Sequence, residues 1–173
     1  MKEVENDASD HIYTHLFRFK STHTTLNYLL RAEYHKGDVF GIKFYAKTHQ
    51  KSNKKYSLLT NRGYALRILR TCASVVPILL KEYPTASFGF IGSRLLDELR
   101  QEIEAPESTI RYRVYEKVVQ DLFGSQTFAH YAYPKISGYL LINRRKDIES
   151  TKQAIERMFM QNYSEIHNYQ DLI

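Results

Sequence analysis

The chain has 173 residues, of which 43% are hydrophobic and 13% aromatic, with a formal net charge of +6 and one cysteine, Cys72. The hydrophobic content excludes a largely disordered chain, and a lone cysteine excludes an internal disulfide framework. The sequence shows no signal peptide, no apolar run approaching about 18 residues and no zinc-type Cys/His spacing, so we expect a cytoplasmic protein without a membrane span or metal.

The first third of the chain predicts a short tail followed by three strands. Residues 1–10 are polar and acidic, which is typical of a flexible tail. Apolar residues then alternate with polar ones over 11–20, 26–34 and 39–47, as in half-buried strands. Because their connections are short, we expect these strands to form an antiparallel meander.

The rest of the chain alternates between helices and strands. A wide apolar stripe predicts a buried helix from Thr60 or Asn61 to about Tyr83, kinked at Pro77. A run that is apolar on both faces, 87–91, predicts a central strand. Later segments predict two amphipathic helices, a hairpin and a terminal helix, over 94–104, 109–123 (capped by Ser108), 126–144 and 147–163.

This order predicts a single α+β domain over residues 11–145. Its sheet is mixed and mostly antiparallel, it is flanked by helices, and a C-terminal helix and tail follow over 146–173. The amphipathic terminal helix also predicts a docking element for a protein partner or for a second copy of the chain.

The distribution of charge favours an anionic ligand. No Asp or Glu occurs between Val39 and Lys81, a span that carries nine Lys and Arg residues. Such a positive field attracts nucleic acid or a polyphosphate cofactor, although a solvated basic surface has the same composition. For a catalytically inert nucleic-acid-binding module, the expected phosphate contacts are Lys47, Lys51, Lys54, Lys55, Arg144 and Arg145. That function requires one basic stripe joining the 47–56 loop to 144–146.

The stretch "TNRGYALRILR", 60–70, predicts a helix start that can hold an anion. Helix N-termini present free N–H groups, and Gly63 allows a ligand close to the backbone. Arg62 and Arg67 are placed to pair with phosphate oxygens. Simple capping by Thr60 or Asn61 explains the same residues.

The order of elements, "GYALRIL" and "IRYRVYEK" together resemble the GNAT superfamily of acyl-CoA N-acyltransferases. The resemblance implies a V-shaped gap between the central strands, acetyl-CoA as cofactor, and acyl transfer to an amine with Tyr115 as general acid. Thr60 departs from the Gln or Arg of that family. Residues implied in cofactor binding are Asn61, Arg62, Gly63, Tyr64, Ala65 and Arg67. The general base is open among Glu33, His35 and His130.

Residues 55–145 also resemble a family of small bacterial domains of unknown function. The shared features are an Asn-x-Gly helix start, a Tyr-Pro before a strand, a Gly-Ser, and a Thr-Arg run that ends in tyrosine. This resemblance implies no activity. We expect the following residues to line a substrate or anion crevice at the end of the central strand: Gly92, Ser93, Thr109, Arg111 and Arg113.

Overall fold

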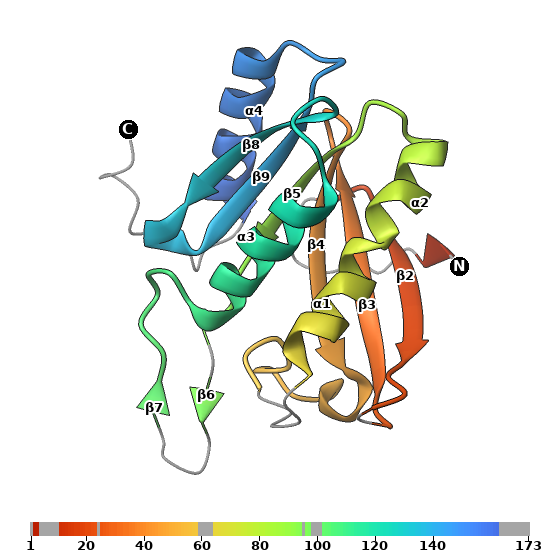
Figure 1. The fold of residues 1–173 in the computed structure, drawn as a ribbon, viewed down its shortest axis with the longest axis vertical. Coiled ribbons are helices and arrows are strands. Elements are labelled where there is room, and N and C mark those ends of the chain that lie inside the picture. Colours follow the sequence, from red (N-terminus) through yellow and green to blue (C-terminus); the bar gives the residue numbers. More distant parts are fainter. Residues whose placement is uncertain are drawn as a thin grey trace.

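The computed structural model describes residues 2–3, 11–23, 25–58, 64–94, 96–97 and 102–162. Within them the chain forms a mixed α+β fold, with one large sheet between two layers of helices (Figure 1). The α+β class and the mostly antiparallel sheet predicted from the sequence are confirmed.

The large sheet has the strand order β1-β2-β3-β4-β5-β9-β8. Its neighbours pair antiparallel except for β4 and β5, which run parallel. A separate two-stranded hairpin joins β6 to β7. The strands are β1 (Lys2–Glu3), β2 (Tyr13–Lys20), β3 (Asn27–His35), β4 (Val39–Ala46), β5 (Ser87–Ile91), β6 (Leu96–Asp97), β7 (Glu102–Ile103), β8 (Phe128–Tyr133) and β9 (Gly138–Asn143).

Helices cover both faces of the sheet. The parallel β4–β5 pair requires a crossover connection, which α1 and α2 provide. They share one face with α3, whereas α4 lies on the other face behind β8 and β9 (Figure 1). The helices are α1 (Ala65–Ala73), α2 (Val75–Glu82), α3 (Ile110–Leu122) and α4 (Ile148–Asn162), with short 3-10 turns at Lys47–His49 and Pro134–Ile136.

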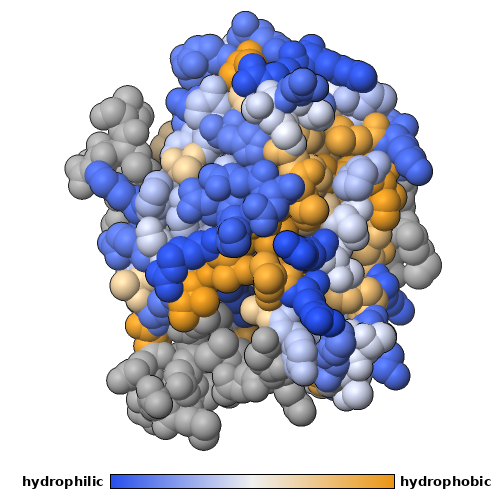
Figure 2. Space-filling model, viewed as in Figure 1, coloured by the Kyte–Doolittle hydropathy of each residue, from blue (hydrophilic) through white to orange (hydrophobic). Residues whose placement is uncertain are grey.

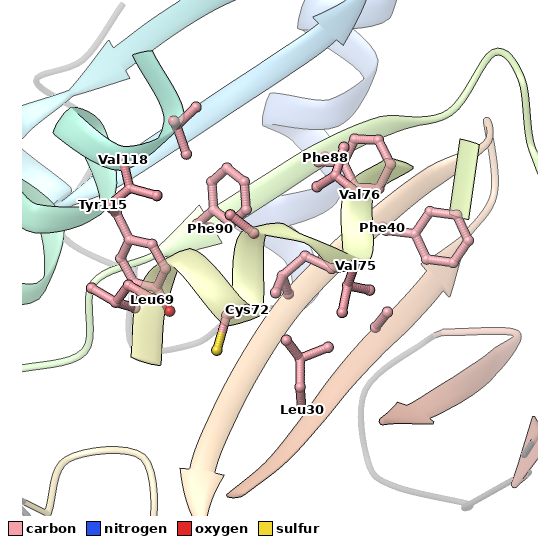
Figure 3. Packing of buried hydrophobic residues seen from close by; sticks show 14 of the residues in the cluster. Leu30, Phe40, Leu69, Cys72, Val75, Val76, Phe88, Phe90, Tyr115 and Val118 are labelled. Carbon is pink, nitrogen blue, oxygen red and sulfur yellow. The ribbon is translucent and has the colours of Figure 1, made fainter. Parts of the chain in front are cut away.

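The main core lies between the sheet and helices α1 to α3. Figure 3 shows Cys72 and Val76 directed at the sheet, where Phe40 and Phe88 stack with ring centroids 5.7 Å apart. Both phenylalanines are fully buried. Full burial of a side chain of this size stabilises the fold by about 1.5–3 kcal/mol. A smaller cluster on the opposite face packs Ile155 of α4 against β9.

Three predictions about the helices were wrong in detail. The helix predicted to end near Tyr83 is two helices, α1 and α2, separated at Ser74. Pro77 accounts for the break, because a proline ring clashes with the carbonyl four residues earlier, here that of Ala73. The first four residues of the predicted helix lie outside the described residues, and α1 begins at Ala65.

The second error is the helix predicted over 94–104, where the described residues form the β6–β7 hairpin. Ile103 is 59% exposed there. A short helix is marginal in water unless tertiary packing covers its apolar face. The third concerns α3, whose amphipathic pattern predicts a core face that includes Ile110 and Leu122, although both residues are exposed. Figure 2 shows apolar surface on the face of the molecule that carries α1 to α3.

The chain termini fit the domain prediction only in outline. Lys2–Glu3 pairs with β2, and the other residues of the predicted tail lie outside the described ones. The terminal helix α4 packs Ile155 and Phe159 against the sheet of its own chain. In the part of the chain that the structure describes, no helix is both long enough and apolar enough to cross a membrane.

Candidate ligand site at the ends of the central strands

The pairing of the parallel strands β4 and β5 stops at Ile42 and Phe90, one residue before β5 ends. Their register runs from the pair Val39 and Ser87 to the pair Ile42 and Phe90. Beyond Ile42, β4 continues to Ala46 paired with β3 alone, and Ile91 of β5 pairs only with β9. Helix α1 begins at this same end of the sheet (Figure 1). The carboxyl ends of parallel strands and a following helix start are where open α/β sheets commonly bind ligands.

Tyr115 of α3 spans the two parting strands. Its ring stacks on Phe90 of β5 at 5.6 Å and meets Phe44 of β4 edge to face at 6.2 Å. Tyr115 is buried, and Figure 3 shows it directed at the core beside Leu69. Burial raises the pKa of its hydroxyl well above the ordinary value. The side chain therefore stays protonated at neutral pH.

Arg111 lies one helical turn before Tyr115 and faces the same gap. Its guanidinium stands over the Phe44 ring, 5.8 Å from the centroid, and Nη2 donates a 3.0 Å hydrogen bond to the carbonyl of Leu58. No carboxylate among the described residues forms an ion pair with it. Burial lowers the pKa of the guanidinium, and electrostatic interactions with Tyr115 and Glu104 partly offset this shift. Glu104 is thus a nearby counter-charge, but no carboxylate of the described residues makes the ion-pair contact that normally offsets the desolvation of a buried cation.

The remaining residues of the predicted crevice hold the start of α3 in place. Thr109 is the N-cap of α3, and not Ser108 as the sequence predicted. Its Oγ1 accepts from Tyr112 N at 3.2 Å and donates to the Gly92 carbonyl at 2.9 Å. Its backbone N–H donates to Ser137 Oγ at 2.8 Å. Gly92 N–H donates to the Ser137 carbonyl at 2.7 Å. This closed network locks α3 onto the end of β5 and the β8–β9 connection.

Ser93 and Arg113 lie beside this network and differ in exposure. Ser93 is half-buried, whereas Arg113 is exposed and donates to the Ser108 carbonyl at 2.7 Å. Arg111 and Arg113 are only two positions apart in the chain, but Arg111 is partly buried at the sheet and Arg113 is exposed to solvent. Of the predicted crevice residues, only Arg111 is brought together with Tyr115 at the gap.

The helix start predicted to hold an anion is described from Tyr64 onward. Tyr64 is exposed and its ring stacks on His23 at 4.9 Å. Arg67 contacts His23 Nε2 through its guanidinium, and Ala65 is exposed. Thr60, Asn61, Arg62 and Gly63 lie outside the described residues. The first turn of α1 contains no acidic side chain, so no carboxylate there competes for an anion.

The basic residues predicted for nucleic acid fall at opposite ends of β4. Lys55 stands over Tyr45 and Tyr56, 5.1 and 5.3 Å from their ring centroids, beyond the C-terminal end of the strand. Lys47, Lys51 and Lys54 belong to the same connection. At the other end, Lys146 Nζ donates to the Gly37 carbonyl and lies 3.5 Å from Asp38 Oδ2. Beside it, Arg144 Nε donates to the Ser125 carbonyl at 2.5 Å, and Arg145 is exposed.

The three candidate bases are placed apart from Tyr115. Glu33 lies on the sheet face opposite α1, 2.8 Å from Lys43 Nζ and 3.3 Å from Arg31 Nε. His35 is buried on that face as well. His130 on β8 is hydrogen-bonded to the Tyr139 hydroxyl at 3.1 Å. No group of His, Cys, Asp or Glu able to hold a metal occurs in the described part of the chain.

Sequence reasoning missed Phe44, Phe90 and Leu58 as members of the site. Both phenylalanines were expected only as residues of the strands predicted at 39–47 and 87–91. Their role at the gap follows from the β4–β5 register, which links positions far apart in the chain. Comparison of the chain with protein-family models, with curated proteins and with solved structures gives no match.

Proposed function

We propose that the chain binds an acyl-CoA-type ligand at the parting ends of β4 and β5. The observation that carries the proposal is Arg111, a largely buried guanidinium without a carboxylate partner in the described residues, at the place where the strands separate. Guanidinium groups suit phosphate and carbonyl oxygens because of their planar array of donors. The ligand would supply an anionic oxygen in direct contact with the guanidinium, which no carboxylate of the described residues provides.

The arrangement around Arg111 supports a long ligand with phosphates at one end. Arg111 is bonded to Leu58, which leads in sequence toward the start of α1. Phosphates at that start would meet backbone N–H groups and Arg67. A pantetheine arm would then reach the apolar gap bounded by Phe44 and Phe90. The gap between the central strands is what the resemblance to acyl-CoA N-acyltransferases implies, and it adds support.

The proposal covers binding, and Tyr115 as it stands is a poor general acid. A general acid works best when its pKa is near the working pH. Burial moves the Tyr115 pKa in the other direction, further above that of an alkyl thiol, for which about 8.5 is the guide given by cysteine. Proton transfer from Tyr115 to a leaving thiolate is therefore uphill. The hydroxyl can hydrogen-bond a thioester without transferring its proton.

The basic surfaces favour this function over nucleic-acid binding. The two groups of cations lie at opposite ends of an eight-residue strand, β4, about 25 Å in length. Lys146 is paired with Asp38, so part of the second group is already neutralised. A continuous basic stripe needs uncompensated charge along the whole path between the groups.

Calorimetric titration of CoA and acetyl-CoA into the protein tests the proposal. We expect binding to weaken by about 10- to 100-fold in Arg111→Gln, since a hydrogen bond to a charged group contributes about 1.5–3 kcal/mol. Arg113→Gln is the matched control, because it removes the same charge two residues away from an exposed position. We expect it to change affinity by less than about twofold. Circular dichroism checks that both variants fold.

Pantetheine and adenosine 3′,5′-bisphosphate separate the two ends of the ligand. Binding of the bisphosphate alone would place recognition at the start of α1. The proposal fails if wild-type protein binds neither CoA nor acetyl-CoA at millimolar concentration. It fails too if a short RNA binds in a salt-dependent way that a Lys51/Lys54/Lys55 charge reversal abolishes, while CoA does not compete.

A further inference from the structure

A second candidate site lies on the opposite face of the sheet, between α4 and strands β5 and β9. It is a cavity of about 450 Å³, within the range of small-molecule sites. Its apolar wall includes Ile91, Ile136, Leu140, Phe159 and Met160, and every residue that lines it is described. The acyl-CoA proposal does not involve this face, so the inference stands apart from it.

Gly138 of β9 lines the cavity, and Gly89 of the neighbouring strand β5 lies under the Phe159 ring. On this face of the β5–β9 pair, Gly89 lies opposite Leu140 and Gly138 lies opposite Ile91. The Phe159 ring occupies the space above Gly89, where a Cβ atom would come within 2.4 Å of Phe159 Cζ. Above Gly138 the nearest side-chain atom is Ile136 Cδ1, 2.8 Å from the position of a Cβ atom. Space remains between this part of the sheet and α4.

The inner polar groups of the cavity neutralise one another. Tyr133 donates a 2.5 Å hydrogen bond to Glu156 Oε1. Lys152 Nζ lies 3.3 Å from the same oxygen and stands over the Tyr131 ring at 5.3 Å. All four side chains are only partly exposed. This network adds no net charge, and it fixes the polar wall in one arrangement before any ligand binds.

Arg157 is the cation of the lining that has no carboxylate partner among the described residues. Its Nε donates to the Gln153 carbonyl at 3.2 Å, and no carboxylate of the described residues pairs with it. Glu149, the remaining ionised lining residue, lies in the first turn of α4, where a negative charge is stabilised by the helix dipole. It also accepts from Gln153 Nε2 at 3.1 Å. The formal charges of the lining sum to zero, and Arg157 is its cation without an ion-pair partner among the described residues.

We propose that this cavity binds a small hydrophobic carboxylate. The apolar body would lie over Gly138 between Leu140 and Ile136, and the carboxylate would pair with the Arg157 guanidinium at the rim. Arginine presents two parallel N–H donors that match a carboxylate. Lys152 retains N–H donors beyond its contact with Glu156 and faces the same cavity.

Titration of the full chain with three eight-carbon probes tests the inference. Calorimetry and amide chemical shifts measure the binding. Octanoate is expected to bind saturably with a dissociation constant below about 1 mM, and octan-1-ol and octylamine at least about tenfold more weakly. Shifts are expected in β9 and α4. Arg157→Gln should weaken octanoate about tenfold, whereas the exposed Arg145→Gln, away from the cavity, should leave it unchanged.

A second variant tests the shape of the cavity. In Gly138→Ala the added Cβ would lie 2.8 Å from Ile136 Cδ1, 3.0 Å from Ile136 Cγ1 and 3.6 Å from Tyr133 Cβ, so the Ile136 side chain has to shift. We expect the variant to fold and to bind octanoate several-fold more weakly. Three outcomes overturn the proposal: no saturable octanoate binding, equal binding of the three probes, or shifts confined to the face of α1 to α3. Retained affinity in both Arg157→Gln and Gly138→Ala would overturn it as well.

Discussion

Replacing Gly92 by alanine should destabilise the protein far more than the same change at Gly124. A Cβ atom at Gly92 would lie 2.6 Å from Thr109 Oγ1, 2.6 Å from Tyr112 N and 2.9 Å from Tyr112 Cα. Two of these atoms belong to the backbone of the first turn of α3, which cannot rotate away. The Cβ therefore forces α3 off the end of β5.

The expected cost follows from two contributions. Loss of the Thr109 cap is worth about 0.5–2 kcal/mol, and overpacking a closed contact costs about 1–3 kcal/mol. We expect Gly92→Ala to lower the free energy of unfolding by about 2–4 kcal/mol. At exposed Gly124 a Cβ atom meets nothing within 4 Å, and its φ is not positive. Gly124→Ala should therefore raise stability by about 0.4–1 kcal/mol.

Urea unfolding followed by circular dichroism measures both differences. Thr109→Ala completes a double-mutant cycle, because it removes one of the three atoms that the new Cβ would meet. The combined loss in Gly92→Ala/Thr109→Ala should be smaller than the sum of the single losses. A Gly92→Ala variant within about 0.5 kcal/mol of wild type would refute the argument that this network fixes the start of α3.

Two further predictions concern buried ionisable groups. Burial raises the pKa of Glu33, but Lys43 and Arg31 outweigh it and hold that pKa below the ordinary value of about 4.3. Its stabilising contribution is therefore present above that value and is lost as pH falls through the lowered pKa. In urea unfolding measured at several pH values, the free energy of unfolding should fall less steeply toward acid pH in Glu33→Gln than in wild type. An unchanged slope of this free energy against pH would contradict the reasoning. Burial also raises the pKa of the Cys72 thiol, so a thiol reagent should react with it only as fast as the protein unfolds around α1. Rapid reaction without urea would show that α1 is not packed against the sheet.

The meander could be predicted because one face of each strand is buried. Strands predicted at 11–20, 26–34 and 39–47 are observed at 13–20, 27–35 and 39–46. Alternation fixes the register when a shift by one residue would expose the apolar face. The hairpin at β6 and β7 was missed because the three leucines and one isoleucine of 94–104 match a helical stripe, and nothing local shows that Ile103 would be exposed.

The candidate site could be predicted only along the helix. Helical periodicity places Arg111 and Tyr115 on one face of α3, and both do face the gap. What lies opposite them depends on which strands are neighbours, and the parallel β4–β5 pairing joins segments separated by two helices. Similarly, Gly92 and Thr109 stood out in the sequence, but their side-by-side contact shows that they serve the fold of α3.

Counting charges pointed to the acid-free span 39–81, yet Arg111 and Arg157, which carry the two proposals, lie outside it. Within that span, Lys43 is paired with the fully buried Glu33 from the neighbouring strand, and Arg70 lies 3.8 Å from Asp121 of α3. Carboxylates distant in sequence therefore neutralise part of the span once the chain folds. Arg111 and Arg157 each have only a backbone carbonyl as hydrogen-bond acceptor within the described residues. Because an uncompensated cation beside apolar surface gains most from a bound anion, local compensation is a better guide to an anion site than the net charge of a segment.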